Sequence, residues 1–462
     1  MNTISSQNPF FETYSTLHST VPFDKIKTGD YVPAIREGIR RQNAEIEAII
    51  RNPEAPTFAN TVLAYEKSGE MLHRVSTVFG NLLSAETDDD LQELAKEIMP
   101  MMSEHENNIS LNEELFARIK AVYKQQDKET LSPEQHKLLE DIYNGFVRNG
   151  ANLLGEDKEK YRALCKELSL LTLQFSENNL KETNDYKLVI TDKSQLAGLP
   201  ESAVEAAAET AGEKGVEGWV FTLQAPSYGP FLTYADSRDL RRELYMAYNT
   251  KCTHDNASNN LEIVKKLANV RMEIAQLLGY DNFAEYNLQE RMAQNSESVY
   301  KLLDQLLEAY TPTAKQEYAE VQALARQAEG EDFVLMPWDW AYYSHKLKDR
   351  KFNIDDELLR PYFELNNVKQ GVFGLATRLY GITFKKNPDI PVYHKDVDAY
   401  EVFDKDGKFL AVFYTDFHPR AGKRSGAWMT SYKEQWIDEK TGENSRCLLY
   451  TSPSPRDRSL SR

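Results

Sequence analysis

The residues best suited to metal chemistry in this sequence are its histidines, and their spacing excludes one common zinc motif. An HExxH helix needs two histidines four positions apart, which places both on one helix face, with a glutamate between them that activates a zinc-bound water. Only His105 is followed by glutamate, and Ile109 stands where the second histidine would be. We interpret His105 and Glu106 as a pair on a helix surface. The histidines are His18, His73, His105, His136, His254, His345, His394 and His418.

Two segments that combine aromatic and charged residues are further candidates for a binding site. The first, residues 226–251, reads as a turn that enters a helix carrying a ladder of arginine and glutamate. We expect its aromatic side chains in the core and its charges on a solvated face. The second, residues 338–343, is an aromatic cluster beside a helix, and we expect it to pack against protein rather than to stack on a ligand.

A third segment, residues 413–429, reads as a strand, a turn and a second strand. Gly422 and Gly426 lie in the turn, where the missing side chain lets the backbone pass close to another group. His418 has no partner that the sequence reveals, so we expect an exposed polar residue rather than a metal ligand.

Apolar periodicity predicts a mainly helical chain. Residues 158–180 keep an apolar stripe with a period near that of an α-helix, and the other predicted helices show shorter versions of the same pattern. The predicted helices are 35–50, 60–83, 91–102, 133–147, 158–180, 201–210, 238–250, 259–278, 283–291, 296–328, 355–363 and 368–380.

Strand signals are short and gather near the C-terminal end. Apolar runs between turn residues predict strands at 186–190 and 219–223. Residues 400–403 and 409–414 flank a glycine-containing turn, which predicts a β-hairpin. Residues 427–432 predict a third strand beside it.

The composition indicates a globular protein with more than one domain. The chain has 462 residues, of which 41% are apolar and 27% charged. It carries 55 Lys and Arg against 72 Asp and Glu, a net charge of −17, which argues against a nucleic-acid partner. A basic or neutral peptide would suit this charge, although a net negative charge by itself mostly keeps a protein soluble.

Cysteines and targeting signals point to a reducing compartment. Cys165, Cys252 and Cys447 are far apart and form no CxxC pair, so neither a disulfide framework nor a structural zinc cluster is expected. The opening residues lack the basic and apolar stretches of a signal peptide. No stretch reaches the ~18 apolar residues that crossing a bilayer needs. We expect a cytoplasmic protein with no membrane partner.

The three segments, in their order and spacing, resemble the thimet oligopeptidase-like family of zinc metallopeptidases, which includes oligopeptidase A. The branch most similar to this sequence is that of the bacterial peptidyl-dipeptidases, or dipeptidyl carboxypeptidases. Residues 8–10, 22–26 and 58–61 also resemble that branch.

The resemblance implies a mainly α fold, with a multi-helix, two-lobed peptidase architecture around a channel and a small antiparallel β-sheet near the C-terminal end. It implies cleavage of short peptides with release of C-terminal dipeptides, by a protein that is a monomer when intact. It also implies one zinc ion, held by the two histidines of an HExxH helix and a later glutamate. This chain holds no HExxH, so we expect it to be inactive by itself. The alternative is a non-catalytic helical scaffold or peptide-binding protein.

The resemblance places the peptide-contacting residues at Ser425, Gly426 and Ala427. They would lie on an edge strand beside the zinc helix, where an added strand of peptide is held by backbone hydrogen bonds. Alternatively, Gly426 and Ala427 simply allow tight packing of the sheet. No catalytic residue and no metal ligand is predicted within this chain.

The family-like sequence is expected to end at Arg446, where a stretch rich in Ser, Pro and Arg begins. We predict a helical region at 1–235 that forms a channel wall, the first part of a catalytic domain at 236–446, and a non-native tail at 447–462. An ordinary disordered tail is the alternative for the last region. The chain is therefore predicted to be a C-terminally truncated fragment.

Overall fold

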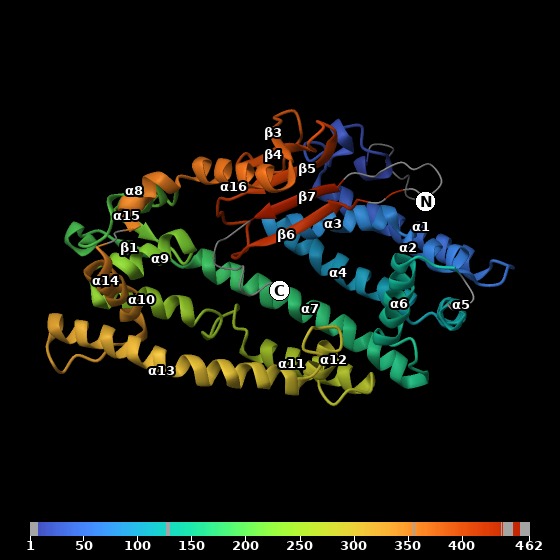
Figure 1. Ribbon diagram of the computed structural model, residues 1–462, viewed down its shortest axis with the longest axis horizontal. Helices are drawn as coiled ribbons and strands as arrows, with labels where there is room; N and C mark the ends of the chain where they lie inside the picture. The colour runs from blue at the N-terminus through green and yellow to red at the C-terminus, as the bar shows by residue number, and fades with distance from the viewer. Residues whose placement is uncertain (1–7, 126–129, 354–355, 436, 438–446, 453–462) are drawn as a thin grey trace. The chain divides into compact units, whose positions relative to one another are not determined.

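The computed structural model (Figure 1) describes residues 8–125, 130–353, 356–435, 437 and 447–452. The fold is mainly α with small sheets, as predicted. The chain divides into two compact units, and unit 1 comprises Met1–Leu173, Leu267–Tyr280 and Phe373–Arg462. Unit 2 comprises Gln174–Lys266 and Asp281–Val372. The predicted division after residue 235 separates a channel wall from the first part of a catalytic domain, and that assignment of roles stays a prediction.

Unit 1 begins with short helical turns and then builds a helical layer in which α4, α5 and α6 start at side-chain caps. The side chains of Asp88, Asn112 and Ser132 accept hydrogen bonds from the backbone N–H groups three residues ahead, which satisfies donors that a helix start leaves free. The helices are α1 (Tyr31–Ile50), α2 (Ala64–Glu66), α3 (Glu70–Ala85), α4 (Asp89–Ser110), α5 (Glu113–Lys124), α6 (Pro133–Arg148) and α7 (Gly155–Asp185), the last of which continues into unit 2.

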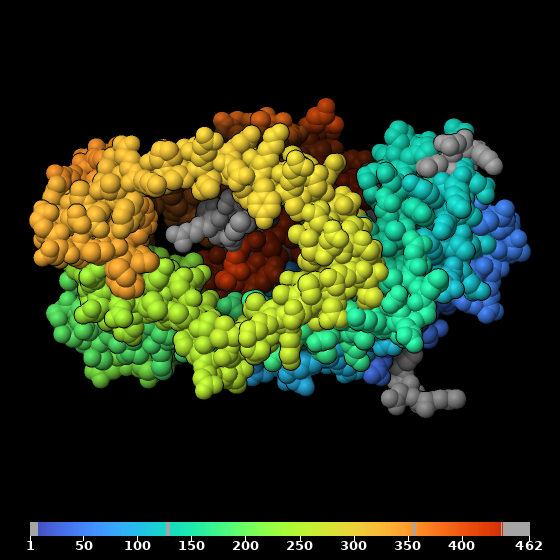
Figure 2. Space-filling view, turned by 90° about the horizontal axis from the view of Figure 1, so that it is seen from below, coloured from blue at the N-terminus to red at the C-terminus, as the bar shows by residue number. Residues whose placement is uncertain are grey.

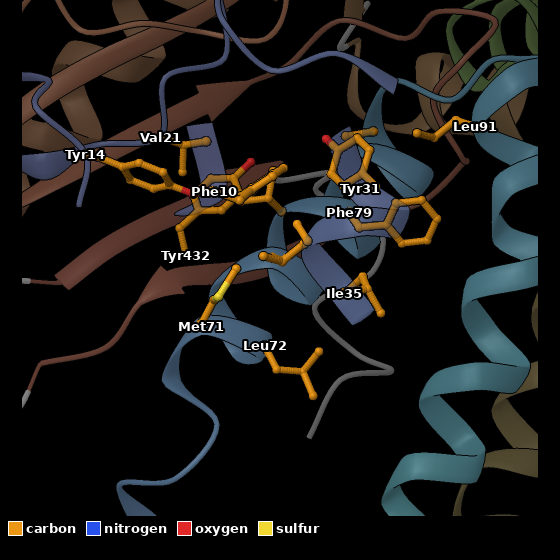
Figure 3. Packing of buried hydrophobic residues seen from close by; sticks show 14 of the residues in the cluster. Phe10, Tyr14, Val21, Tyr31, Ile35, Met71, Leu72, Phe79, Leu91 and Tyr432 are labelled. Carbon is orange, nitrogen blue, oxygen red and sulfur yellow. The ribbon is translucent and has the colours of Figure 1, made fainter. Parts of the chain in front are cut away.

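The main core of unit 1 joins the two ends of the chain that the structure describes. Figure 3 shows Phe10, Tyr31 and Phe79 packed together, with Tyr432 from near the C-terminal end beside them. The rings of Tyr31 and Phe79 meet edge to face at 5.3 Å between centroids. Such aromatic contacts add to the free energy gained by burying apolar surface. Tyr432 therefore shares one core with residues near the start of the sequence.

The sheet of unit 1 has five strands in the order β3-β4-β5-β7-β6 (Figure 1). β3 to β5 are antiparallel neighbours, β5 and β7 are parallel, and β7 and β6 are antiparallel. Within the described residues, the sheet therefore ends in β6 on one side and β3 on the other. The strands are β3 (Thr383–Lys386), β4 (Val397–Phe403), β5 (Phe409–Asp416), β6 (Trp428–Lys433) and β7 (Cys447–Ser452).

Unit 2 combines a two-stranded sheet with helices. One core gathers around Phe221, Phe231 and Leu244, and a second joins Val321 and Ala325 to Tyr343. The elements are β1 (Leu188–Ile190), α8 (Glu201–Glu213), β2 (Trp219–Phe221), α9 (Ala225–Tyr234), α10 (Arg238–Asn249), α11 (Leu261–Leu277), α12 (Phe283–Leu288), α13 (Ser296–Glu329), α14 (Trp340–Phe352), α15 (Asp356–Leu359) and α16 (Leu365–Tyr380), with α11 and α16 continuing into unit 1.

Helix α13 is the longest helix of unit 2 and forms a surface ridge, yellow in Figure 2. Only Val321 and Ala325 of its residues are buried, and both lie in its C-terminal half. Leu303 and Leu307, by contrast, are more than half exposed. The C-terminal half therefore anchors the helix to unit 2.

Two local expectations from the sequence are wrong. Residues 226–235 do not form a turn before a helix, because Pro226 stands in the first turn of α9, where its missing N–H is not needed. The expected three-stranded sheet has five strands, and one of them, β7, lies in the segment predicted to be a tail. The proposal that residues 447–462 are not native concerns their origin and stays a prediction.

Candidate functional site

The predicted peptide-contacting residues lie in the turn that leads into β6. Ser425 and Gly426 are exposed and Ala427 is half-buried. Gly426 has a φ of 107°, a backbone region that residues with a side chain rarely adopt. β6 begins at Trp428, the residue after Ala427, and it is an outermost strand of the described sheet. The three residues are therefore placed before the strand rather than within it.

The loop between β5 and β6 is held by the buried carboxylate of Asp416, the last residue of β5. The guanidinium of Arg420 binds it through two parallel hydrogen bonds, of 2.8 Å and 2.7 Å. The Lys423 ammonium lies 2.9 Å from the same carboxylate, and the Tyr393 hydroxyl donates to it at 2.7 Å. Paired, hydrogen-bonded charges of this kind are the form in which a buried carboxylate is tolerated.

The same two cations also bind backbone carbonyls. Lys423 Nζ donates to the carbonyls of Asp416, at 2.8 Å, and His418, at 3.2 Å. Arg420 Nη2 donates to the carbonyl of Ala85 at the end of α3, and Arg420 Nε pairs with the carboxylate of Glu86. The cations therefore tie the path of the loop to β5 and to α3.

Backbone contacts complete this anchoring. Thr87 N donates to the Gly422 carbonyl at 2.7 Å, and Arg424 N donates to the Ser84 carbonyl at 2.9 Å. A Cβ atom at position 422 would lie 2.4 Å from the Thr87 carbonyl oxygen, closer than real Cβ atoms approach. The predicted close approach at Gly422 is thus confirmed, and its partner is the α3–α4 corner.

The charges of this cluster shift its pKa values. Burial alone would raise the pKa of the Asp416 carboxyl, but hydrogen bonds from Arg420, Tyr393 and Lys423 outweigh it and lower that pKa to about 2. Burial lowers the pKa of the Lys423 ammonium more than Asp416 raises it. We call Asp416, Arg420 and Lys423 the Asp416 cluster.

A second buried carboxylate joins the first two sequence segments within unit 2. The Asp339 carboxylate accepts hydrogen bonds from Nη2 of Arg238, at 2.7 Å, and from Nη2 of Arg241, at 3.1 Å. Arg241 also donates to the carbonyls of Ala235, at 2.7 Å, and Asp236, at 3.1 Å. Asp339 and Arg241 are buried, with exposed fractions of 0% and 1%. We call Asp339, Arg238 and Arg241 the Asp339 cluster.

The Asp339 cluster corrects one expectation and confirms another. The charges of the first segment were expected on a solvated face, which is wrong for Arg241, because it lies under the ring of Tyr342 at 4.0 Å from its centroid. The aromatic cluster of the second segment was expected to pack against protein, and Tyr342 and Tyr343 are buried. Burial and a hydrogen bond to Asp236 raise the pKa of the Tyr342 hydroxyl.

The histidines form no metal site in the part of the chain that the structure describes. Within those residues, no three or more His, Cys, Asp or Glu side chains gather so that they could hold a metal ion. His418 is exposed, as predicted. His105 is not on a surface as predicted; it is buried and bonds Gln42 through Nε2 at 2.7 Å. Burial lowers the pKa of that imidazole.

Sequence reasoning missed the Asp416 cluster as a group. The signal was an aspartate at the end of a buried strand, followed by arginine four and lysine seven positions later. Such spacing is common on exposed turns, and only the packing of Tyr393 and the α3 carbonyls shows that these charges are buried. Among residues 8–125, 130–353, 356–435, 437 and 447–452, no helix has the length and apolar character needed to cross a membrane.

Comparison with known proteins gives a consistent result over most of the chain. Residues 231–457 match the model of peptidase family M3. The match continues beyond Arg446, so the family-like sequence does not end there as predicted. The chain is 39% identical to the dipeptidyl carboxypeptidase of Escherichia coli K12 over 441 residues, which is 95% of this chain and 64% of that protein.

Two further relatives extend this similarity. The oligopeptidase A of Escherichia coli K12 is 33% identical over 412 residues, covering 88% of this chain and 60% of that protein. A probable cytosolic oligopeptidase A of Arabidopsis thaliana is 33% identical over 437 residues, covering 92% and 61%. The chain therefore spans less than two thirds of the length of the curated relatives it matches.

Proposed function

We propose that the whole protein is a member of peptidase family M3, a zinc-dependent peptidase that cleaves short peptides and releases dipeptides from their C-termini. The observation that carries the proposal is the 39% identity to a dipeptidyl carboxypeptidase across 95% of this chain. The similarity to oligopeptidases supports the broader class of peptidase acting on short peptides.

Within that function, the residues from Ser425 to the end of β6 would hold the substrate. β6 is paired to β7 on one side and ends the described sheet on the other. An extended peptide could add to this edge through backbone hydrogen bonds, with little dependence on its sequence. Ser425, Gly426 and Ala427 would then contact the peptide where it meets the start of the strand.

The residues present do not fit the zinc ion that the family implies. The sequence contains no HExxH, and the described residues contain no cluster able to hold a metal ion. No step of peptide hydrolysis can therefore be assigned to the side chains of this chain. We expect the 462-residue chain to bind no catalytic zinc and to hydrolyse no peptide by itself.

Two preparations test the proposal. The product of the complete gene is incubated with an N-terminally blocked short peptide, with and without a metal chelator, and released dipeptides are measured by mass spectrometry. Chelator-sensitive release of C-terminal dipeptides is the expected result. The 462-residue chain is the matched control, with no release and no stoichiometric zinc by elemental analysis. A complete gene product that releases no dipeptide would overturn the proposal.

A non-catalytic, peptide-binding scaffold is the second candidate. It is favoured by the finding that no group of His, Cys, Asp or Glu side chains among the described residues could hold a metal ion. The two candidates differ in the same assay, because a scaffold would bind the blocked peptide and leave it intact in both preparations. Chelator-sensitive cleavage by the complete gene product would exclude the scaffold.

A cytoplasmic location is part of the proposal. It is supported by the free thiols of Cys165 and Cys252, which a reducing compartment preserves. Burial raises the pKa of both thiols, so neither is activated as a nucleophile.

A further inference from the structure

The buried cations of the Asp416 cluster form hydrogen bonds with backbone carbonyls as well as with carboxylate side chains. Lys423 donates to the carbonyl of Asp416 at the end of β5 and to that of His418 in the loop, and Arg420 donates to the carbonyl of Ala85 in α3. Burying an ammonium and a guanidinium costs solvation free energy, and apolar residues of similar size often give equal or greater stability. What apolar residues could not supply is a fixed path for the loop backbone.

The fixed path ends at the start of β6. Gly422 is held against Thr87 through its carbonyl, and Arg424 N is held by the Ser84 carbonyl. From Arg424, only residues 425–427 remain before β6 begins at Trp428. The segment predicted to contact peptide is therefore a short span between an anchored point and a strand.

The strand at the other end of this span is fixed too. Tyr432 in β6 is buried, packs edge to face on Tyr414 at 5.9 Å between centroids, and receives a hydrogen bond from Asn81 of α3. A slip of one residue would turn Tyr432 out of the core, because strand side chains alternate between faces. With both ends fixed, the backbone groups of residues 425–427 have few alternative positions.

We propose that Arg420 and Lys423 are positioning residues for peptide binding: they hold the loop so that residues 425–427 and β6, an outermost strand of the described sheet, present their backbone groups in one fixed arrangement. This inference rests on the proposed function, because it needs β6 to receive a peptide. Neither residue is proposed to touch the peptide. Their contribution is to order the loop before binding, which removes an entropy cost that binding would otherwise carry.

The experiment compares Lys423→Met and Arg420→Lys with the unchanged 462-residue chain. Lys423→Met keeps the side-chain length and removes the donors to the loop carbonyls. Arg420→Lys keeps the charge and removes the two parallel hydrogen bonds to Asp416. Peptide-resolved hydrogen exchange follows residues 417–427, and fluorescence anisotropy gives the Kd of a fluorescein-labelled blocked short peptide.

We expect exchange in residues 422–427 to become about tenfold faster in Lys423→Met, because local opening costs less without the anchor. The Kd should rise about fivefold as the loop must be ordered on binding. Lys423→Arg, which restores a buried cation, should recover most of both changes. Leu115→Ala is the matched control, because it destabilises a separate core of unit 1 without touching the loop.

The outcomes separate the two levels of the argument. If exchange of the loop is unchanged in both variants, or changes equally in Leu115→Ala, the positioning role is overturned. If the loop loosens as expected but the Kd is unchanged, the positioning role for peptide binding is also overturned. If the unchanged chain binds no peptide while the loop loosens in the variants, the assignment of a peptide to β6 fails and the anchoring of the loop stands.

Discussion

Two aspartates are buried among the described residues, and they solve the same physical problem in different ways. Asp339 in unit 2 receives hydrogen bonds from two arginines, and Nη1 of Arg241 also donates to the carbonyls of Ala235 and Asp236. Asp416 in unit 1 receives Arg420 and Lys423, and Arg420 has a second carboxylate partner in Glu86. Each carboxylate is fully buried.

The difference lies in what each cluster connects. The Asp339 cluster joins Arg238, the first residue of α10, to Asp339, the residue just before α14, within one unit. The Asp416 cluster joins a loop to the end of α3. Loss of the first should weaken the packing of helices, whereas loss of the second should loosen one loop. A buried charge cluster therefore does not have one fixed role.

Removing the two carboxylates should show this difference most strongly. Asp339→Ala leaves Arg241 buried without a carboxylate partner, and we expect the free energy of unfolding of unit 2 to fall by about 4 kcal/mol. Asp416→Ala leaves Arg420 paired with Glu86, and the expected loss in unit 1 is about 2 kcal/mol. Urea titration followed by hydrogen exchange of each unit measures both values.

Asp304→Ala is the control for that comparison. Asp304 is exposed on α13, and its loss should change stability by less than about 0.5 kcal/mol. Equal losses in Asp339→Ala and Asp416→Ala would show that the second partner of Arg420 contributes nothing, and the comparison would fail.

The sequence predicted the helices far better than the buried charges. Apolar spacing identified α6 and α13 almost to their ends, because one apolar face of a helix is recorded in the order of its residues. Arg241 was expected on a solvated face, since spacing along α10 does not tell which face meets α14. β7 was missed because its pairing with β5 and β6 comes from distant parts of the chain.

The candidate site shows the same limit. The turn, Gly422 and the strand after it were predicted from local residue types, and the structure confirms the close approach at Gly422. Its partner, the Thr87 carbonyl, lies hundreds of positions away in the sequence and has no local signal. His105 was misplaced for the same reason, because its partner Gln42 comes from α1.

Acid should weaken the Asp416 cluster in a defined range. The pKa of the Asp416 carboxyl is lowered to about 2 in the folded state, below its value of 3.8 in the unfolded chain. Its contribution, about 2 kcal/mol, is therefore present above pH 3.8 and is lost as the pH falls toward 2.

The unfolding free energy of unit 1, measured from pH 5 to pH 2 in the unchanged chain and in Asp416→Asn, tests that expectation. Because Asn cannot titrate, the variant should lose less stability over this range, by about 2 kcal/mol. If the unfolding free energy falls equally with pH in the two proteins, Asp416 does not cause the acid sensitivity, and its cluster contributes no more to stability than surface charges do.

A methyl group at position 422 probes the backbone part of the same anchor. Gly422→Ala places a Cβ atom 2.4 Å from the Thr87 carbonyl oxygen, and we expect a loss of about 1–2 kcal/mol in unit 1 together with faster exchange of the loop. Gly80→Ala is the matched control. Gly80 lies in the middle of α3 and is exposed, and nothing lies within 4 Å of the Cβ atom that the substitution adds. That variant should gain about 0.5–1 kcal/mol. A loss in both would indicate that contact with Thr87 is not the cause.

The smallest effect should come from an ion pair that shares the chemistry of the clusters but not their burial. Arg36 and Glu97 lie 2.8 Å apart in unit 1, with side chains 65% and 47% exposed. Water already solvates both groups, so Arg36→Ala should change the free energy of unfolding by less than about 0.5 kcal/mol, and added salt should shrink even that. Urea titration at low and high salt measures it. A loss as large as that of Asp416→Ala would mean that distance rather than burial sets the strength of these pairs, and the contrast between clusters and surface would have to be abandoned.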